Sequence, residues 1–216
     1  MGRTREFDVD TALEVAAKLF WEKGYEGTSL AELTSGMGIN PPSFYIAFKS
    51  KAALFRLVLE RYRKQYLGFA AQALEETTAR AVAEHLLFGY ADLLASPDHP
   101  PGCLAMNSAW VADGDGIREE LKEHRELRKK TLRKRFQRAI SEGDLPAGTS
   151  AEALANYVMV VAWGMALEGQ SGASRRELKR LAQSAMNAWP QQTGTRAFRQ
   201  SPQSGSARRA SVASAG

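Results

Sequence analysis

The most reactive side chain in this 216-residue sequence is its single cysteine, Cys103. Cys103 follows a proline-rich loop and begins a predicted helix, and a helix N-terminus lowers the pKa of a thiol. His99 is close by in the sequence. This arrangement favours a redox or electrophile sensor, or a thiol-dependent oxidoreductase. The alternative is a small buried apolar residue, because most free cysteines are buried in that way.

Metal-binding chemistry is not indicated. The three histidines, His85, His99 and His124, are too scattered to match the ligand spacing of a zinc site. Asp113 and Asp115 resemble part of a calcium loop, but the twelve-residue pattern is missing, so we interpret them as a turn. A single cysteine also excludes an intrachain disulfide. We therefore expect no metal and no cofactor.

A second group of polar residues surrounds a short uncharged segment at 40–48. Asn40, Ser43 and Tyr45 could offer hydrogen bonds to base edges in the major groove of DNA. Phosphate contacts are expected around the segment, from Thr28 and Ser29 at a helix start and from Tyr45, Lys49 and Lys51. Arg3 and Arg5, before the first helix, could reach a minor groove.

The net charge of +5 comes mostly from the end of the chain, where four arginines and no acid follow Trp189. An overall basic balance is therefore weak evidence for nucleic acid binding. Basic residues do cluster between Lys49 and Lys64, where six of them face only Glu60. This cluster is either a phosphate-binding surface or a solvated helix face.

The elements that must position these residues are all predicted to be helices. Apolar residues recur at helical spacing and no stretch alternates as a strand would. Thr28, Asn40 and Ser50 are predicted N-caps, and Gly24 and Gly36 predicted stops. Nine helices are expected, at 9–23, 28–36, 41–47, 51–76, 80–95, 104–112, 117–142, 151–168 and 175–189.

Two short helices joined by the glycine-containing turn at 36–40 and packed on a longer first helix predict a helix-turn-helix unit. We expect an all-α protein with a DNA-binding domain at 1–50, a helical ligand-binding and dimerisation domain at 51–189, and a low-complexity tail at 190–216. The charged N-terminal segment predicts no secretory signal and no apolar stretch approaches the length of a membrane span, so a soluble cytoplasmic protein is expected.

The runs AKLFWEKGY at 17–25, TSLAEL at 28–33 and GMGINPPSFYIAFKSKAALF at 36–55 resemble the DNA-binding domain of TetR-family transcriptional regulators. PPGCLAMN at 100–107 resembles a segment of some TetR/AcrR-type members. Pro41, Pro42, Ala47 and Ala52 depart from the usual pattern, and the two prolines leave the contacted bases open. The resemblance implies a homodimeric repressor that binds a partly palindromic double-stranded DNA operator and leaves it when a small molecule binds. Pattern and resemblance together predict DNA contacts from Thr28, Ser29, Asn40, Pro41, Ser43, Phe44, Tyr45, Lys49 and Lys51.

The resemblance also requires a dimer surface and a cavity for the unidentified effector. The helix at 151–168 is apolar on nearly every side and the last helix carries one apolar stripe, so we predict dimer contacts from Leu154, Val158, Met165, Leu178, Leu181, Ala185 and Trp189. Alternatively, these residues only close the core of the subunit. Predicted cavity residues are Phe88, Cys103, Met106, Trp110, Tyr157, Val161 and Trp163, which would surround an apolar ligand unless they are core residues.

A repressor of this kind would not be an enzyme. Two other functions remain as alternatives to it. One is the thiol-dependent redox protein or sensor centred on Cys103 with His99. The other is a helical adaptor whose basic tail binds nucleic acid without sequence preference.

Overall fold

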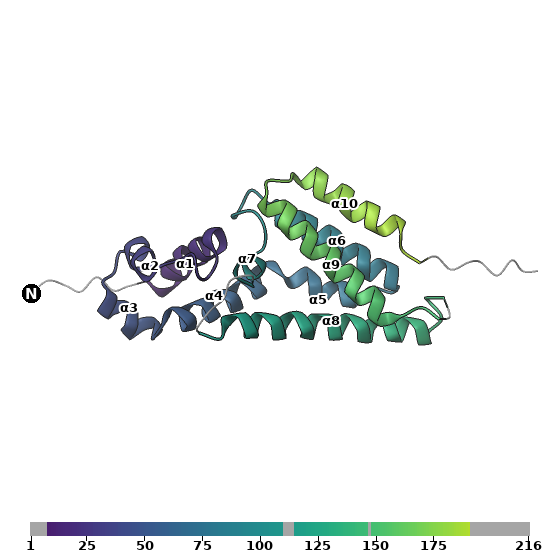
Figure 1. Ribbon diagram of the computed structural model, residues 1–216, viewed down its shortest axis with the longest axis horizontal. Helices are drawn as coiled ribbons and strands as arrows, with labels where there is room; N and C mark the ends of the chain where they lie inside the picture. Colours follow the sequence, from purple (N-terminus) through teal and green to yellow (C-terminus); the bar gives the residue numbers. More distant parts are fainter. Residues whose placement is uncertain (1–7, 110–114, 147, 191–216) are drawn as a thin grey trace, which may run out of the picture.

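The structure, a computed structural model, describes residues 8–109, 115–146 and 148–190. Every regular element in these ranges is a helix, and the helices form an elongated molecule with α1–α3 at one end and α6, α9 and α10 at the other (Figure 1). The ten helices are α1 (Val9–Lys23), α2 (Leu30–Met37), α3 (Pro41–Phe48), α4 (Lys51–Tyr66), α5 (Gly68–Leu74), α6 (Ala79–Leu94), α7 (Leu104–Ala109), α8 (Ile117–Ser141), α9 (Ala151–Gln170) and α10 (Arg175–Asn187).

The start of α2 differs from the prediction that Thr28 is its N-cap. Ser29 is the N-cap and forms a capping box with Glu32, in which each side chain accepts a hydrogen bond from the other residue's backbone N–H. The hydroxyl of Thr28 instead donates to the carbonyl oxygens of Gly24 (2.8 Å) and Leu19 (3.2 Å). Thr28 therefore ties the start of α2 to the end of α1.

The predicted start of α3 is confirmed. The side-chain oxygen of Asn40 accepts a hydrogen bond from the backbone N–H of Ser43 (2.9 Å), and Pro41 and Pro42 occupy the first turn, where no N–H partner is needed. Phe44 and Phe48 are buried one helical turn apart. This pair anchors one side of α3 and leaves its opposite side outside the core.

The predicted long helix at 51–76 is wrong in one respect, because it is interrupted at Leu67. Gly68 follows the break, and glycine is a poor helix former. The change of direction lets α5 pack against α6, where the Phe69 and Tyr90 rings meet edge to face at 5.1 Å. The absence of a side chain at Gly89 makes room for Phe69, since a Cβ there would lie 2.4 Å from the ring.

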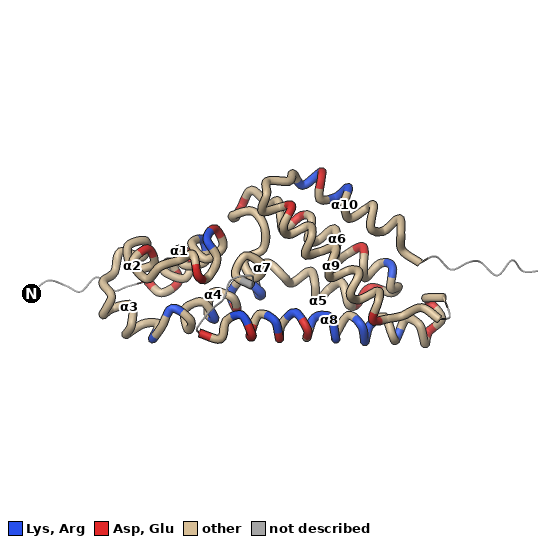
Figure 2. Tube along the Cα trace, viewed as in Figure 1, with Lys and Arg blue, Asp and Glu red and all other residues tan. Residues whose placement is uncertain are grey.

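The second half of the chain forms a helical bundle. The helix α9 packs on α6, α8 and α10, and α10 also packs on α6. The helix α8 is the longest, and blue and red residues follow one another along it in Figure 2 because most of its surface is charged. Among the described residues, no helix combines the length and the apolar character that crossing a membrane requires.

The short helix α7 connects the two ends of the molecule. The Asn107 amide donates to the Trp21 carbonyl (2.8 Å), the Ser108 hydroxyl accepts from the Tyr25 backbone N–H (3.2 Å), and the Trp21 indole donates to the Gly102 carbonyl (3.1 Å). The end of α1 is thereby held on the 102–108 segment. The predicted extension of this helix to residue 112 lies outside the described residues.

Candidate DNA-binding and ligand-binding sites

The helix α3 presents an uncharged, solvent-exposed surface at one end of the molecule (Figure 2). Tyr45 is 49% exposed and Ile46 is 75% exposed, and Pro41, Pro42 and Ala47 are also exposed. Ser43 is half-buried beside the Asn40 cap. An exposed helix of this kind, fixed by a buried aromatic pair, has the shape and the chemistry to enter a major groove.

Two residues predicted to contact DNA are inside the protein. Phe44 and Thr28 are both fully buried, and the Thr28 hydroxyl is engaged by two backbone carbonyls. We therefore remove both side chains from the DNA-binding set. The predicted set leaves out Ile46 and Ala47, which are exposed beside Tyr45 because the buried Phe44 and Phe48 turn residues 45–47 outward.

The two lysines beside α3 occupy specific positions. Lys49 follows α3 with a backbone φ of +67°, and its ammonium group donates to the Ile46 carbonyl (3.3 Å). The ammonium group of Lys51, in the first turn of α4, lies 4.3 Å from the centre of the Tyr25 ring. The Lys49 charge therefore lies at the end of α3, whereas the Lys51 charge lies over the Tyr25 ring just after α1.

The remaining basic residues of the 49–64 cluster are mostly paired with acids. Arg56 pairs with Glu120 of α8, Arg61 pairs with Asp10 (2.7 Å) and Glu14 of α1, and Lys64 pairs with Glu60 (2.7 Å). Exposed pairs of this kind add little stability each. The acids in these pairs neutralise the positive charges that a phosphate would need. The ion pairs therefore favour a structural role for this part of the cluster.

The predicted dimer contacts need correction. Leu154, Val158, Met165, Leu178, Ala185 and Trp189 are buried inside the subunit, and the Trp189 ring packs on Phe136 at 5.5 Å. Only Leu181 of the predicted set is exposed. The exposed apolar side of α9 carries Val160 and Leu167 on either side of Gly164, whose missing side chain faces open space. Because α9 is apolar on nearly every side, the sequence did not indicate which side faces the core, and the predicted residues of α9 lie on the buried side.

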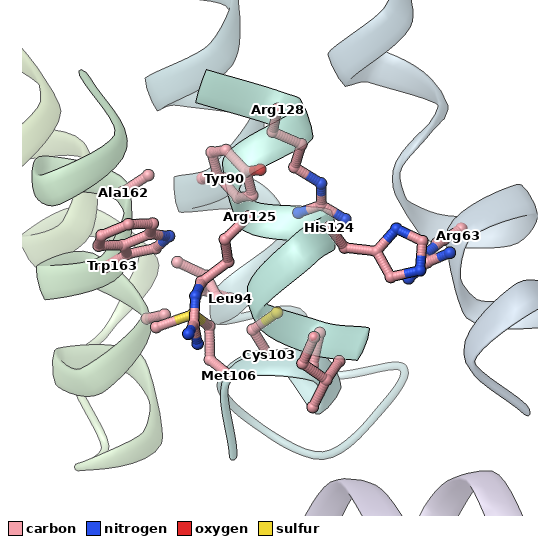
Figure 3. A pocket seen from close by; sticks show the side chains of 13 residues that line it. Arg63, Tyr90, Leu94, Cys103, Met106, His124, Arg125, Arg128, Ala162 and Trp163 are labelled. Atoms are coloured by element: carbon pink, nitrogen blue, oxygen red, sulfur yellow. The ribbon is translucent and has the colours of Figure 1, made fainter. Parts of the chain in front are cut away.

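A small cavity lies between α4, α6, α7, α8 and α9 (Figure 3). Of the predicted cavity residues, Cys103, Met106 and Trp163 line it. Phe88 lies beside the start of α10, the Tyr157 hydroxyl donates to the Ala185 carbonyl (2.7 Å), and Val161 packs on the core without lining the cavity. Trp110 lies outside the described residues, as do Arg3 and Arg5 of the predicted arm.

The cavity also contains residues that the sequence analysis missed. Tyr90 comes from α6, Arg63 comes from α4, and His124, Arg125 and Arg128 come from α8. Periodicity could not single them out, because charged residues occur along all of α8. The lining is therefore more basic than the predicted apolar pocket.

Cys103 and His99 do not form the predicted thiol–imidazole pair. Cys103 is 4% exposed and accepts a hydrogen bond from the Tyr62 hydroxyl (3.2 Å), which keeps its proton because burial raises the pKa of Tyr62. His99 stacks on Trp21 and lines a different groove, between α1 and α4. No hydrogen bond joins the two within the described part of the chain. In those same ranges, no three His, Cys, Asp or Glu side chains are grouped as metal ligands would be.

Comparison with protein families matches two parts of the chain. Residues 12–58 match the model described as bacterial regulatory proteins, tetR family, and residues 80–185 match the tetracyclin repressor-like C-terminal domain. The first match covers most of α1, all of α2 and α3 and the first half of α4, and the second covers nearly all of α6 and all of α7–α9, which form the cavity together with α4, and most of α10.

Individual relatives agree with these matches. The chain is 31% identical over 194 residues to the HTH-type transcriptional repressor ComR of Escherichia coli, which covers 88% of this chain and 92% of that protein. It is 51% identical over 61 residues to the repressor BdcR of the same organism, which covers 28% of this chain and 31% of that protein. Among solved structures, a cysteine-substituted variant of the TetR-family regulator CifR, complexed with 26-base-pair double-stranded operator DNA, has a TM-score of 0.80 at 36% identity and covers 88% of this chain and 100% of that one.

Proposed function

Because this chain belongs to the TetR family of DNA-binding transcriptional regulators, we propose that it is a homodimeric repressor that a small-molecule effector releases from a partly palindromic operator. The observation that carries the proposal is the exposed outer side of α3, at Tyr45 to Ala47, on a helix whose inner side is fixed by Phe44 and Phe48. Under this proposal the protein acts by binding its operator and its effector, and it catalyses no reaction.

We assign base contacts to the exposed residues of α3 and phosphate contacts to the residues around them. Ser43, Tyr45, Ile46 and Ala47 would face base edges, where methyl groups and hydroxyls can distinguish bases. Asn40 and Pro41 would lie at the tip of the helix. The exposed Ser29 at the start of α2, with Lys49 and Lys51, would contact phosphates.

A dimer would place two copies of α3 at the spacing of successive major grooves, about 34–36 Å apart. The exposed apolar side of α9 and α10, with Val160, Gly164, Leu167 and Leu181, supports a dimer surface there. Exposed large apolar side chains become buried if a partner covers them. A small residue such as Gly164 allows two helices to approach closely.

The path from cavity to DNA runs through α4 and α7 in this proposal. Arg63 of α4 lines the cavity, and α4 begins directly after α3. Cys103 and Met106 line the cavity, while Gly102, Asn107 and Ser108 of the same segment bind α1. A ligand that moved α7 or α4 would therefore shift α1–α3. A hundredfold loss of operator affinity would require about 2.7 kcal/mol of coupling.

The test begins with selection of bound duplexes from a random pool by the full chain. A symmetric consensus is expected, and a consensus without two-fold symmetry would contradict the proposal that the protein is a dimer.

Ile46→Ala should weaken binding and relax base preference at one position of each half-site, by about 1–3 kcal/mol. Leu57→Ala, which also truncates an exposed apolar side chain but on α4, is the control that should leave binding unchanged.

Phosphate contact is tested separately with Lys51→Ala. We expect weaker binding to all sequences and a salt slope reduced by about 1. Lys134→Ala removes the same charge from an exposed position near the other end of the molecule and should change neither quantity. An unchanged affinity and salt slope in Lys51→Ala would show that this lysine serves only its contact with Tyr25.

A further inference from the structure

The cavity beside Cys103 is small. Its volume is about 30 Å³, which is enough for one or two water molecules. A larger ligand must therefore move part of the wall. Met106 and Trp163 are only half-buried, and both lie at the end of the cavity away from Arg63 (Figure 3). Methionine is the most adaptable apolar side chain, so this end can open most easily.

One end of the cavity is strongly basic. Arg63, Arg128 and the imidazole of His124 lie there, whereas the Arg125 side chain extends towards Met106 (Figure 3). The lining includes no carboxylate. None of the three arginines belongs to an ion pair among the described residues. This end of the cavity therefore carries positive charge without a matching acid.

Two of the nearby acids are paired with other basic residues. Glu120 reaches towards this region but pairs with Arg56, and Glu60 pairs with Lys64. The buried Tyr90 lines the same cavity as Arg128, and burial raises the pKa of its hydroxyl, so it stays neutral and compensates no charge. Part of the positive charge of Arg63 and Arg128 is therefore not compensated by these carboxylates, so an additional negative group can bind there.

The positive groups also repel one another. Burial and the Arg128 charge lower the pKa of Arg63, and burial with the charges of Arg63 and Arg128 lowers the pKa of His124. Glu120 and Glu123 act in the opposite direction on His124 but less strongly. A bound anion would relieve this repulsion, because it would be close to several positive groups at once.

The opposite end of the cavity is apolar. Leu94, Ala162 and Ala166 form part of its wall, and Met106 and Trp163 complete that end. The Trp163 ring is held from outside by Lys129, whose ammonium group lies 5.1 Å from the ring centre. A ligand that spans the cavity would therefore meet the guanidinium groups of Arg63 and Arg128 at one end and mainly carbon atoms, with Arg125 beside them, at the other.

We propose that the effector is a small organic acid whose anionic group lies between Arg63 and Arg128 and whose apolar part packs against Met106 and Trp163. This inference rests on the proposed function, because it names the ligand class of the same cavity. Arg63 belongs to α4 and Arg128 to α8, so one anion bound to both would connect the helix that follows the DNA-binding unit to the ligand domain. Two guanidinium groups are also well suited to hold the two oxygens of a carboxylate.

The experiment compares acids with their neutral amides on the full-length protein. Acetate, hexanoate, benzoate and phenylacetate are each titrated beside the matching amide and beside inorganic phosphate, with binding measured by calorimetry. We expect at least one of the larger carboxylates to bind at least about tenfold more tightly than its amide and than phosphate. Arg128→Gln and Arg63→Gln should each weaken that binding by at least about tenfold.

Arg133→Gln is the matched control, since it makes the same change on an exposed position of α8 outside the cavity, and it should leave binding unchanged. Two results would overturn the inference: carboxylates that bind no better than their amides, or binding that survives both Arg63→Gln and Arg128→Gln. Phosphate binding as tight as that of the carboxylates would overturn the apolar half of the assignment.

Operator binding is measured in parallel on the selected duplex without any ligand. Sequence-specific binding with no carboxylate preference would refute the inference and leave the proposed function standing. A carboxylate that binds through Arg63 and Arg128 to a protein without sequence-specific DNA binding would support the ligand site and refute the proposed function.

Discussion

His124 shows how a single residue reports the charge of its surroundings. It lies on α8 with Arg128 and faces Arg63 of α4, and burial and these two charges lower its pKa below the ordinary value of 6.5. The neutral imidazole is therefore favoured in the folded protein. Because the unfolded chain binds the proton more readily, acidification below about pH 6.5 should favour unfolding.

The corresponding prediction concerns His124→Gln. In the native sequence, the free energy of unfolding should fall as the pH drops from 7 towards 5, and the contribution of His124 stays below the about 1.4 kcal/mol per pH unit of one full proton. The glutamine variant should lose that contribution and show a flatter profile. Urea unfolding at pH 7, 6 and 5 measures the free energy of unfolding of both proteins. If the native sequence and His124→Gln show the same pH dependence, the imidazole titrates alike in the folded and unfolded states.

At the scale of elements, α3 combines a well-capped start with a strained end. Asn40 and the two prolines satisfy its first turn, whereas its last turn leads into Lys49 at a φ of +67°. Lysine rarely adopts this conformation because its Cβ approaches the backbone, and glycine does so without penalty. A lysine retained there is consistent with a role for its charge at the DNA surface, which is part of our proposal.

Comparing Lys49→Gly with Lys49→Ala separates strain from charge. The glycine variant should gain about 1 kcal/mol of unfolding free energy relative to the alanine variant, because only glycine removes the strain. Both variants should lose the same operator affinity, because both remove the ammonium group. Chemical denaturation and DNA titration give the two quantities; equal stabilities would mean that the backbone there costs nothing.

At the scale of the whole molecule, the junction between α1 and α7 determines how the DNA-binding unit is held. Gly24 ends α1 at φ 72° and ψ 174°, a region that glycine alone adopts readily. A Cβ at this position would lie 2.8 Å from the Asn107 carbonyl oxygen. The close approach of the two helices therefore depends on a missing side chain.

Gly24→Ala should reduce the unfolding free energy by about 2–4 kcal/mol, from backbone strain and from the clash with α7. Gly38→Ala is the control, because Gly38 has a similar φ of 66° but an open space around its Cβ position, and it should cost only about 1 kcal/mol. Thermal and urea unfolding measure the unfolding free energies of the two variants. An equally mild effect at Gly24 would mean that α1 can move away from α7 at little cost.

The sequence alone determined the helical fold, the positions of most helices and the DNA-binding unit, because helix caps, the glycine turn and helical periodicity are local properties of the chain. It located α3 and its capping residue Asn40 correctly. It could not decide which side of α9 is inside, since that helix is apolar all round, nor that Thr28 would turn inward to two carbonyls of α1.

Only the tertiary structure brought Arg63, Cys103, Arg128 and Trp163 to one cavity, although they come from three different helices and the loop before α7. It also separated Cys103 from His99, which are neighbours in the sequence. The physical reason is that periodicity reveals which residues share a face of one helix, whereas the partner of that face depends on packing between segments distant in the chain.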